Sequence, residues 1–313
     1  MTEKVSMRVA YGKALAAYGA VNERVVVLDA DVSASTQTHF FAKAFPNRFF
    51  NVGVAEAGMV DVAVGLALGG KIPFVNTFAF LLALRAAEQV RTCVAYARTN
   101  VKLVGSYAGL SDAFDGPTHH AICDVAVMRA IPNMTVVVAA DAVEVAKLVP
   151  AVAEYDGPVY LRVSRADVPL VFGEDHAVTI GKGTVLRDGN DVTLVATGIM
   201  VTRALSAADQ LHAQGISVRV VSIHTIKPLD NELILRAAEE TGALVTIEEH
   251  SVVGGLGGAV AEFLSGERPT PIVRVGLQDT FARTGAYDTL LDMFGMSVND
   301  IAAAAKRAVS LKR

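Results

Sequence analysis

The chain has 313 residues, with 28 Lys plus Arg against 32 Asp plus Glu and a formal net charge of −4 at pH 7. This balance excludes the basic surface by which proteins bind nucleic acid or anionic lipid. The length favours two domains, because single hydrophobic cores stop growing at roughly 250–300 residues.

The sequence is apolar for a protein outside the membrane, with a mean hydropathy of +0.41 and no tryptophan. Asp61, Lys71 and Arg85 nevertheless interrupt the longest apolar stretches, before the ~20 residues that a membrane helix needs. The surplus apolar surface predicts a large subunit interface and therefore an obligate oligomer.

The N-terminal sequence runs directly into a helical pattern and predicts no secretory signal. Cys93 and Cys123 are the only cysteines and lack metal-type spacing, so both are expected to be reduced core residues. These features predict a cytoplasmic protein that binds no metal through its own side chains.

Short β-branched runs alternate with Ala-rich helical stretches along the first half of the chain. The predicted strands are 25–28, 101–104, 135–138 and 159–163, and the predicted helices are 8–18, 58–68, 82–98 and 142–155. Such alternation indicates a parallel sheet covered by helices on both faces.

The pattern breaks in a stretch containing Pro, Gly and Asp, residues 168–190, and a second alternating series follows. It consists of a strand at 192–198, a helix at 201–214 and strands at 218–223 and 244–247. The predicted fold class is therefore α/β, with two consecutive parallel-sheet three-layer domains at residues 1–180 and 181–313.

A glycine cluster at residues 253–258 precedes a predicted helix in the second domain. Such clusters can bind phosphate through backbone N–H groups. This one lacks both the Lys-Ser/Thr of a P-loop and the spacing of a dinucleotide fingerprint. A packed strand-to-helix turn is the favoured interpretation.

Glu56 is the one charged residue in the apolar segment 51–60. A carboxylate in apolar surroundings is costly unless a partner is held against it. The alternative is a partly exposed acid at a helix start, where the helix dipole favours negative charge. The local sequence leaves both interpretations open.

Several segments occur in an order and at intervals that together are specific. They are Arg8 with 10–15, residues 28–31 with Ser35, Glu56, residues 77–80, residues 115–119, residues 162–165 and residues 225–230. In this series the chain resembles the C-terminal half of transketolases, which are thiamine diphosphate enzymes, over essentially its whole length. The resemblance implies a pyrimidine-binding domain followed by a transketolase C-terminal domain.

The resemblance implies that Glu56 binds the aminopyrimidine ring of the cofactor and shares a proton with a ring nitrogen, which promotes deprotonation of the thiazolium carbon. Phe78 would stack on the pyrimidine, with Phe80 and Leu81 as further walls, although core packing is the favoured interpretation for Phe80. Asp31 matches an acid near the cofactor or is a turn residue at a strand end.

The loop 115–119 carries Asp115 and His119 on either side of a rigid Gly-Pro turn. The resemblance implies that Asp115 binds a sugar hydroxyl and that His119 transfers protons near the reacting carbons.

Arg8, Ser35 and Arg165 match positions that bind the substrate phosphate, a task that suits the guanidinium fork. A surface ion pair with Asp167 is the alternative for Arg165.

The chain departs from the family at the distal end of the substrate site. Tyr107 replaces a phosphate-contacting histidine, and Ala113-Phe114 replace the usual Gly-Glu. Tyrosine carries no positive charge near neutral pH. We therefore expect a more apolar wall and a substrate other than the ordinary pentose phosphates. Equal turnover of xylulose 5-phosphate and ribose 5-phosphate would contradict this.

The chain also lacks the Gly-Asp-Gly…Asn motif that holds the cofactor diphosphate and its Mg²⁺ or Ca²⁺ in the family. The expected function is therefore that of the C-terminal subunit of a split transketolase. An N-terminal subunit would complete an α2β2 assembly that acts on sugar phosphates. The alternatives are a beta subunit of a 2-oxo acid dehydrogenase and a non-catalytic partner.

Overall fold

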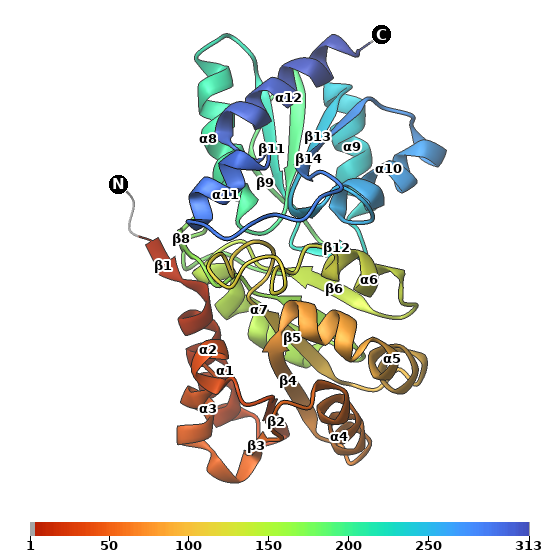
Figure 1. Ribbon diagram of the computed structural model, residues 1–313. Helices are drawn as coiled ribbons and strands as arrows, with labels where there is room; N and C mark the ends of the chain where they lie inside the picture. Colours follow the sequence, from red (N-terminus) through yellow and green to blue (C-terminus); the bar gives the residue numbers. More distant parts are fainter. Residues whose placement is uncertain (1–3, 313) are drawn as a thin grey trace.

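The computed structural model describes residues 4–312, which form two α/β domains stacked end to end, each a sheet packed against helices (Figure 1). The first sheet has the strand order β12-β6-β7-β5-β4-β2-β3. Its strands are β2 (Val25–Asp29), β3 (Phe49–Asn51), β4 (Ile72–Phe78), β5 (Lys102–Ser106), β6 (Thr135–Val138), β7 (Val159–Arg162) and β12 (Thr225–Lys227). All are parallel except β12, which pairs antiparallel with β6 at the edge.

Helices cover both faces of this sheet, which places two layers of apolar side chains against it. β2 and β6 are Val-rich, and both they and β5 are completely buried, as expected of a parallel sheet enclosed on both sides. The helices are α1 (Met7–Val21), α2 (Ser33–Thr36), α3 (His39–Ala44), η1 (Pro46–Arg48), α4 (Glu56–Leu68), α5 (Ala87–Gln89), α6 (Asp124–Ala130) and α7 (Ala142–Glu154).

The second sheet has the order β14-β13-β10-β11-β9, with β9 as its antiparallel edge strand. A small pair of antiparallel strands, β1 (Lys4–Ser6) and β8 (Asp167–Pro169), stands apart from both sheets. The remaining elements are β9 (Thr184–Arg187), β10 (Val192–Ala196), α8 (Met200–His212), β11 (Val218–Ser222), α9 (Asn231–Thr241), β13 (Leu244–Ser251), α10 (Leu256–Glu267), β14 (Ile272–Leu277), α11 (Tyr287–Met293) and α12 (Val298–Ser310).

The α/β class predicted from the sequence is confirmed, with two differences of detail. Each sheet carries one antiparallel edge strand. The helix predicted at 82–98 forms two π-helical segments, η2 (Leu81–Arg85) and η3 (Val90–Tyr96), on either side of α5. Such wide turns occur preferentially at functional sites.

β12 ties the two halves of the chain together. It lies well beyond residue 180 in sequence and yet completes the edge of the first sheet. Lys227 at its end donates from Nζ to the carbonyl oxygens of Arg129 (2.9 Å) and Ile131 (2.6 Å), at the end of α6. The chain therefore passes from the first sheet to the second before β9, returns for β12, and enters the second sheet again at β13.

A buried ion pair reinforces this junction. Arg162 donates from Nε to Asp124 Oδ2 (2.7 Å) and from Nη2 to the carbonyl oxygen of Glu249 (3.0 Å) on β13. Tyr160 donates to the same carboxylate oxygen at 2.7 Å. Arg162 and Asp124 are both almost completely buried, so each compensates the charge of the other.

The glycine cluster forms a packed turn, as the sequence predicts. Glu248 accepts hydrogen bonds from the backbone N–H of Leu256 (2.7 Å) and Gly257 (2.8 Å) at the start of α10. A Cβ added at Gly255 would lie 1.9 Å from this carboxylate. The donors that could bind a phosphate are therefore used by an internal acid.

Cys93 and Cys123 form no disulfide, and both are half-buried rather than enclosed in the core. Among residues 4–312, no helix is long and apolar enough to cross a membrane.

Lys102 on β5 is completely buried. Its Nζ donates to the carbonyl oxygens of Tyr155 (2.6 Å) and Gly157 (2.8 Å), just after α7. Burial lowers the pKa of Lys102 to about 7, although Asp156 opposes the shift.

This pKa makes stability depend on pH. An unfolded lysine keeps its proton up to about pH 10.4, so between pH 7 and 10 the unfolded chain binds more protons than the folded one. Relative to Lys102→Met, the wild-type free energy of unfolding should therefore rise by about 1 kcal/mol or more across this window. Urea denaturation of both proteins at several pH values measures it, and a constant difference would contradict the prediction.

Candidate active site

The predicted site residues gather at one edge of the first sheet. β2, β3, β4, β5 and β7 are parallel, so their carboxyl ends meet there, as in other open α/β sheets. The connections that leave these ends carry Asp31, Glu56, Phe80, Tyr107 and Arg165 in turn. Arg8 reaches the same edge from the first turn of α1.

A pocket of about 440 Å³ lies at this edge. It is largely apolar and aromatic, with one carboxylate and one guanidinium. Its lining residues are Ala30, Val32, Val54, Glu56, Phe78, Phe80, Leu81, Arg85, Thr118 and His119. The structure therefore brings together four residues that the sequence analysis placed at the cofactor, Glu56, Phe78, Phe80 and Leu81. His119, which was predicted to transfer protons near the reacting carbons, lines the same pocket.

Glu56 is the first residue of α4, and only 1% of it is exposed. Arg85 donates from Nη1 to both carboxylate oxygens, at 3.1 Å to Oε1 and 2.9 Å to Oε2. The Arg85 side chain is 53% exposed, so the pair connects a buried acid to the solvent side of the pocket. Sequence reasoning missed Arg85 as a site residue. The feature that could have pointed to it is a basic residue that interrupts an apolar helical stretch.

Aromatic rings form a continuous wall beside Glu56. The ring centroids of Phe78 and Tyr107 are 4.4 Å apart, those of Phe80 and His119 are 5.0 Å apart, and Phe78 meets His119 edge-on at 6.4 Å. Phe80 therefore faces the pocket and is half-buried, rather than lying in the closed core that the residue type alone favoured. His119 Nδ1 lies 3.0 Å from Thr118 Oγ1.

Two arginines flank Tyr107, each with its guanidinium carbon near the ring. The distances to the ring centroid are 5.1 Å for Arg8 and 5.0 Å for Arg165. Arg8 Nη1 donates to the hydroxyl of Tyr107 (3.1 Å) and to the backbone carbonyl of Ser35 (2.7 Å). Tyr107 adopts φ = 61°, a left-handed conformation that bulky residues avoid unless their surroundings enforce it.

Arg165 pairs with Asp112 rather than with Asp167, the alternative considered from the sequence. Its Nη1 donates to Asp112 Oδ1 at 2.8 Å, and Asp112 is completely buried. Burial and the neighbouring Asp115 raise the pKa of Asp112 to about 7, against the opposing effect of Arg165. Sequence reasoning missed Asp112.

The wall at this end is therefore less apolar than expected. Ala113 packs into the core, but the Phe114 side chain is directed largely into solvent, with 69% of the residue exposed. Arg165, which is paired with Asp112, has its guanidinium carbon 5.0 Å from the centroid of the Tyr107 ring.

Asp31 and Asp115 are exposed at the rim. Asp31 has φ = 64° and accepts a hydrogen bond from Asn51 Nδ2 at 2.8 Å, which matches a turn residue at a strand end. It does not line the pocket, whereas its neighbours Ala30 and Val32 do.

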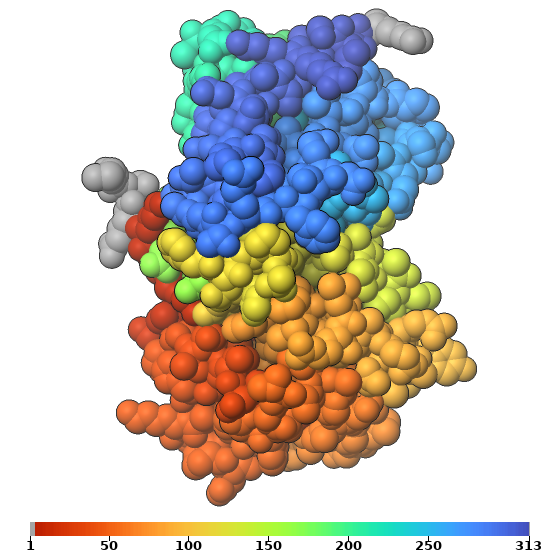
Figure 2. Space-filling view, in the orientation of Figure 1, coloured from red at the N-terminus to blue at the C-terminus, as the bar shows by residue number. Residues whose placement is uncertain are grey.

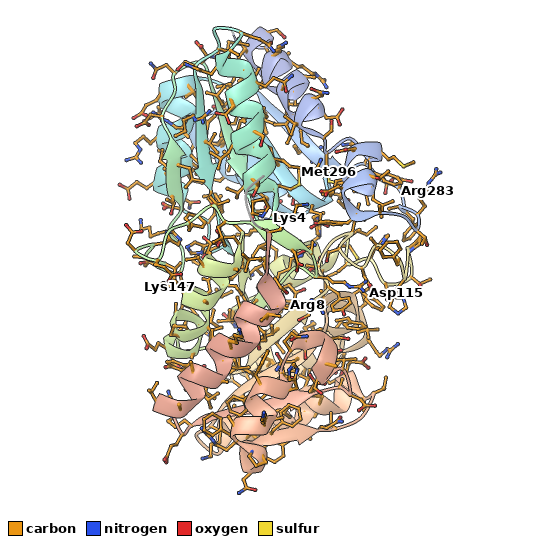
Figure 3. The ribbon with its side chains drawn as sticks, turned by 90° about the vertical axis from the view of Figure 1, so that its left-hand side faces the viewer. Lys4, Arg8, Asp115, Lys147, Arg283 and Met296 are labelled. Atoms are coloured by element: carbon orange, nitrogen blue, oxygen red, sulfur yellow. The ribbon has the colours of Figure 1, made fainter. Side chains whose placement is uncertain are left out.

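The second domain holds the loop between β5 and α6, residues 107–123, in place. Glu249 on β13 accepts from the backbone N–H of Leu110 (2.7 Å), and the N–H of Gly285 donates to the carbonyl oxygen of Ala113 (3.1 Å). Figure 2 shows this loop in yellow directly beneath the blue C-terminal segment. In Figure 3, Asp115 and Arg283 lie at the same edge of the molecule, one from each domain.

Comparison with known proteins agrees with this geometry. Residues 3–171 match the transketolase pyrimidine-binding domain, and residues 181–301 match the transketolase C-terminal domain. This pair of domains defines the class of the protein. The chain belongs to the transketolase family, whose members are thiamine diphosphate-dependent transferases.

The chain is 44% identical over 306 residues to the 6-deoxy-6-sulfo-D-fructose transketolase subunit of Clostridium sp., covering 98% of this chain and 95% of the relative. A solved structure described as a split gene transketolase, inactive beta4 tetramer, is 50% identical with a TM-score of 0.93, covering 99% of this chain and all of that one. Transketolase-like protein 2 of Mus musculus is 40% identical over 98% of this chain, but the match spans only 49% of that protein.

Proposed function

We propose that this chain is the C-terminal subunit of a split transketolase, which transfers a two-carbon ketol unit from a ketose donor to an aldose acceptor. The observation that carries the proposal is the buried Glu56 carboxylate in an aromatic pocket, at the start of α4. The match to one half of a longer relative and the near-complete match to a transketolase subunit support it.

The pocket fits the aminopyrimidine of thiamine diphosphate. Phe78, Phe80 and Leu81 offer apolar faces to a flat ring. Both oxygens of Glu56 accept from the planar N–H groups of Arg85, which is the type of donor that a protonated aminopyrimidine also presents. Thiamine diphosphate, when bound, supplies the carbon nucleophile and electron sink for cleaving a carbon–carbon bond.

The residues of this chain would then act in three places. Glu56 holds a proton at a ring nitrogen of the pyrimidine, in a site shielded from water. His119, which lies against Phe78 and Phe80, exchanges protons with the oxygens of the substrate next to the reacting carbons. Arg8, Arg165 and Tyr107 bind the distal end of the substrate, with Ser35 and Asp115 beside them.

The proposal includes a separate N-terminal subunit that holds the diphosphate and its Mg²⁺ or Ca²⁺, in an α2β2 assembly. Among residues 4–312 no cluster of His, Cys, Asp and Glu could hold a metal ion. Exposed apolar side chains near the pocket, including Val54 and Leu84 with 68% and 53% exposure, suit burial against such a partner.

Reconstitution tests this proposal. The purified chain alone should give no ketol transfer with thiamine diphosphate and Mg²⁺, and adding an N-terminal transketolase subunit should restore it. Restored activity should rise with the partner until the two are equimolar, as measured by a coupled assay and by light scattering for the mass of the complex. Full activity of the isolated chain, or none in the complex with any ketose tested, would contradict the proposal.

A further inference from the structure

We propose that Asp112 makes the distal end of the substrate site selective for a terminal oxyanion with one negative charge, of the sulfonate type, over a doubly charged phosphate. This inference rests on the proposed function, because it concerns the substrate of the same site. The observation behind it is that a completely buried carboxylate is paired with one of the two arginines of that site.

Two positive charges lie around Tyr107. Arg8 and Arg165 are the two cations beside its ring, and the tyrosine hydroxyl contributes a hydrogen bond but no charge. Asp112 neutralises Arg165 at 2.8 Å. The three groups Arg8, Arg165 and Asp112 therefore carry one net positive charge together, which balances one negative charge on a ligand.

A second negative charge on the ligand would meet the carboxylate of Asp112. This carboxylate cannot be screened well, because Asp112 has no exposed surface and its Oδ2 has no hydrogen-bond donor. Asp115 lies on the same side and adds further negative potential, although it is exposed to solvent. Two further titratable groups face this segment. His120 has a pKa lowered by burial and is neutral at pH 8. Glu249 on β13 binds the backbone N–H of Leu110, and burial raises its pKa to about 7, so it adds negative charge on the inner side of the loop.

The Arg165 side chain retains donors for such a ligand. It is 34% exposed, and Asp112 accepts from Nη1 alone, so its remaining N–H groups are free to bind an oxyanion. The pKa of Asp112 is about 7, so its carboxylate is largely ionised at pH 8. A phosphate monoester is doubly charged at that pH and a sulfonate is singly charged.

The test compares two donors that differ only at carbon 6, fructose 6-phosphate and 6-deoxy-6-sulfofructose, in the assembled enzyme at pH 8. The wild type should show a kcat/KM for the sulfonate about tenfold or more above that for the phosphate. Asp112→Asn should shift this ratio toward the phosphate by about tenfold, mainly through KM, because the positive charges of Arg8 and Arg165 are then no longer offset by Asp112. Asp167→Asn, which alters an exposed acid two residues from Arg165, is the matched control and should leave the ratio unchanged.

Three results would overturn the inference. They are a wild-type preference for the phosphate, an unchanged ratio in Asp112→Asn, and an equal loss for both donors in that variant, which would mean that Asp112 only orients Arg165. Calorimetric dissociation constants for the two donors in the wild-type complex give the same comparison if Asp112→Asn does not fold. If neither donor were turned over but the sulfonate bound more tightly, the proposed function would fail and the charge inference would stand.

Discussion

Glu56→Gln should lower kcat for ketol transfer in the assembled enzyme by about 10²- to 10⁴-fold, the range that general acid–base groups contribute. Glutamine keeps the size of the side chain and one acceptor oxygen but cannot hold a proton for a ring nitrogen. Since Glu56 is only 1% exposed and begins a helix, its replacement by an isosteric residue preserves the packing. Steady-state kinetics at saturating cofactor measure the effect.

Glu88→Gln is the matched control. Glu88 lies on α5, three residues after Arg85, and is exposed. Because water screens its charge, Glu88→Gln should change kcat by no more than about twofold. The complex formed by Glu56→Gln should have the same mass as wild type by light scattering. If Glu56→Gln kept full activity, the acid at the start of α4 would have a structural role only.

Asp124→Asn should destabilise the protein by about 3–5 kcal/mol, because it leaves the charge of Arg162 buried without a partner. The pair is almost completely enclosed, and Arg162 also binds the carbonyl oxygens of Ala121 (2.9 Å) and Glu249 (3.0 Å). Chemical denaturation followed by circular dichroism measures the decrease in the free energy of unfolding. Because Arg162 also binds β13, the variant should weaken the contact between the two halves of the chain.

The exposed pair of Arg129 and Glu262 provides the comparison. It has two short hydrogen bonds, at 2.8 and 2.7 Å, but the Glu262 side chain is 66% exposed, so Glu262→Gln should cost less than about 1 kcal/mol. The double variant Asp124→Asn/Arg162→Met should recover part of the loss, because it removes the uncompensated charge. Equal costs at the two sites would contradict this account.

The pair of Asp124 and Arg162 also determines how the stability of the protein changes with pH. Burial alone would raise the pKa of Asp124, but the charges of Arg162 and His250 and the hydrogen bonds from Arg162 and Tyr160 bring it below its ordinary value. A lowered pKa means that the stabilisation is present above the unfolded pKa and is lost as pH falls through the folded one. The difference in stability between wild type and Asp124→Asn should therefore shrink under acid conditions.

The sequence predicts the elements of the fold well where burial on both sides leaves a clear pattern. The Val-rich strands β2, β6 and β10 are completely buried, and their runs of β-branched residues are visible without any structure. β12 could not be foreseen, because three residues at a sheet edge show no periodicity and their partner lies in the other half of the chain.

Some residues of the candidate site could likewise be predicted from the sequence, and others could not. Glu56 stands out because its own neighbours are apolar, and His119 because it follows a rigid turn. Arg85 and Asp112 were missed because each has meaning only beside a partner far along the chain, Glu56 in one case and Arg165 in the other. Their assignment depends on a contact between segments that residue spacing does not reveal.

The C-terminal half of the chain contributes β12 to the sheet of the N-terminal half. This pairing limits where the chain can be cut and which domains can be combined in a chimera. A break in the chain near residue 180 would leave the β6 edge of the first sheet unpaired, and exposed sheet edges promote aggregation. The carbonyl groups after α6 would also lose the lysine that binds them. The two domains thus form one structural unit, and swapping the C-terminal domain between relatives should require that β12 and its β6 partner come from the same parent.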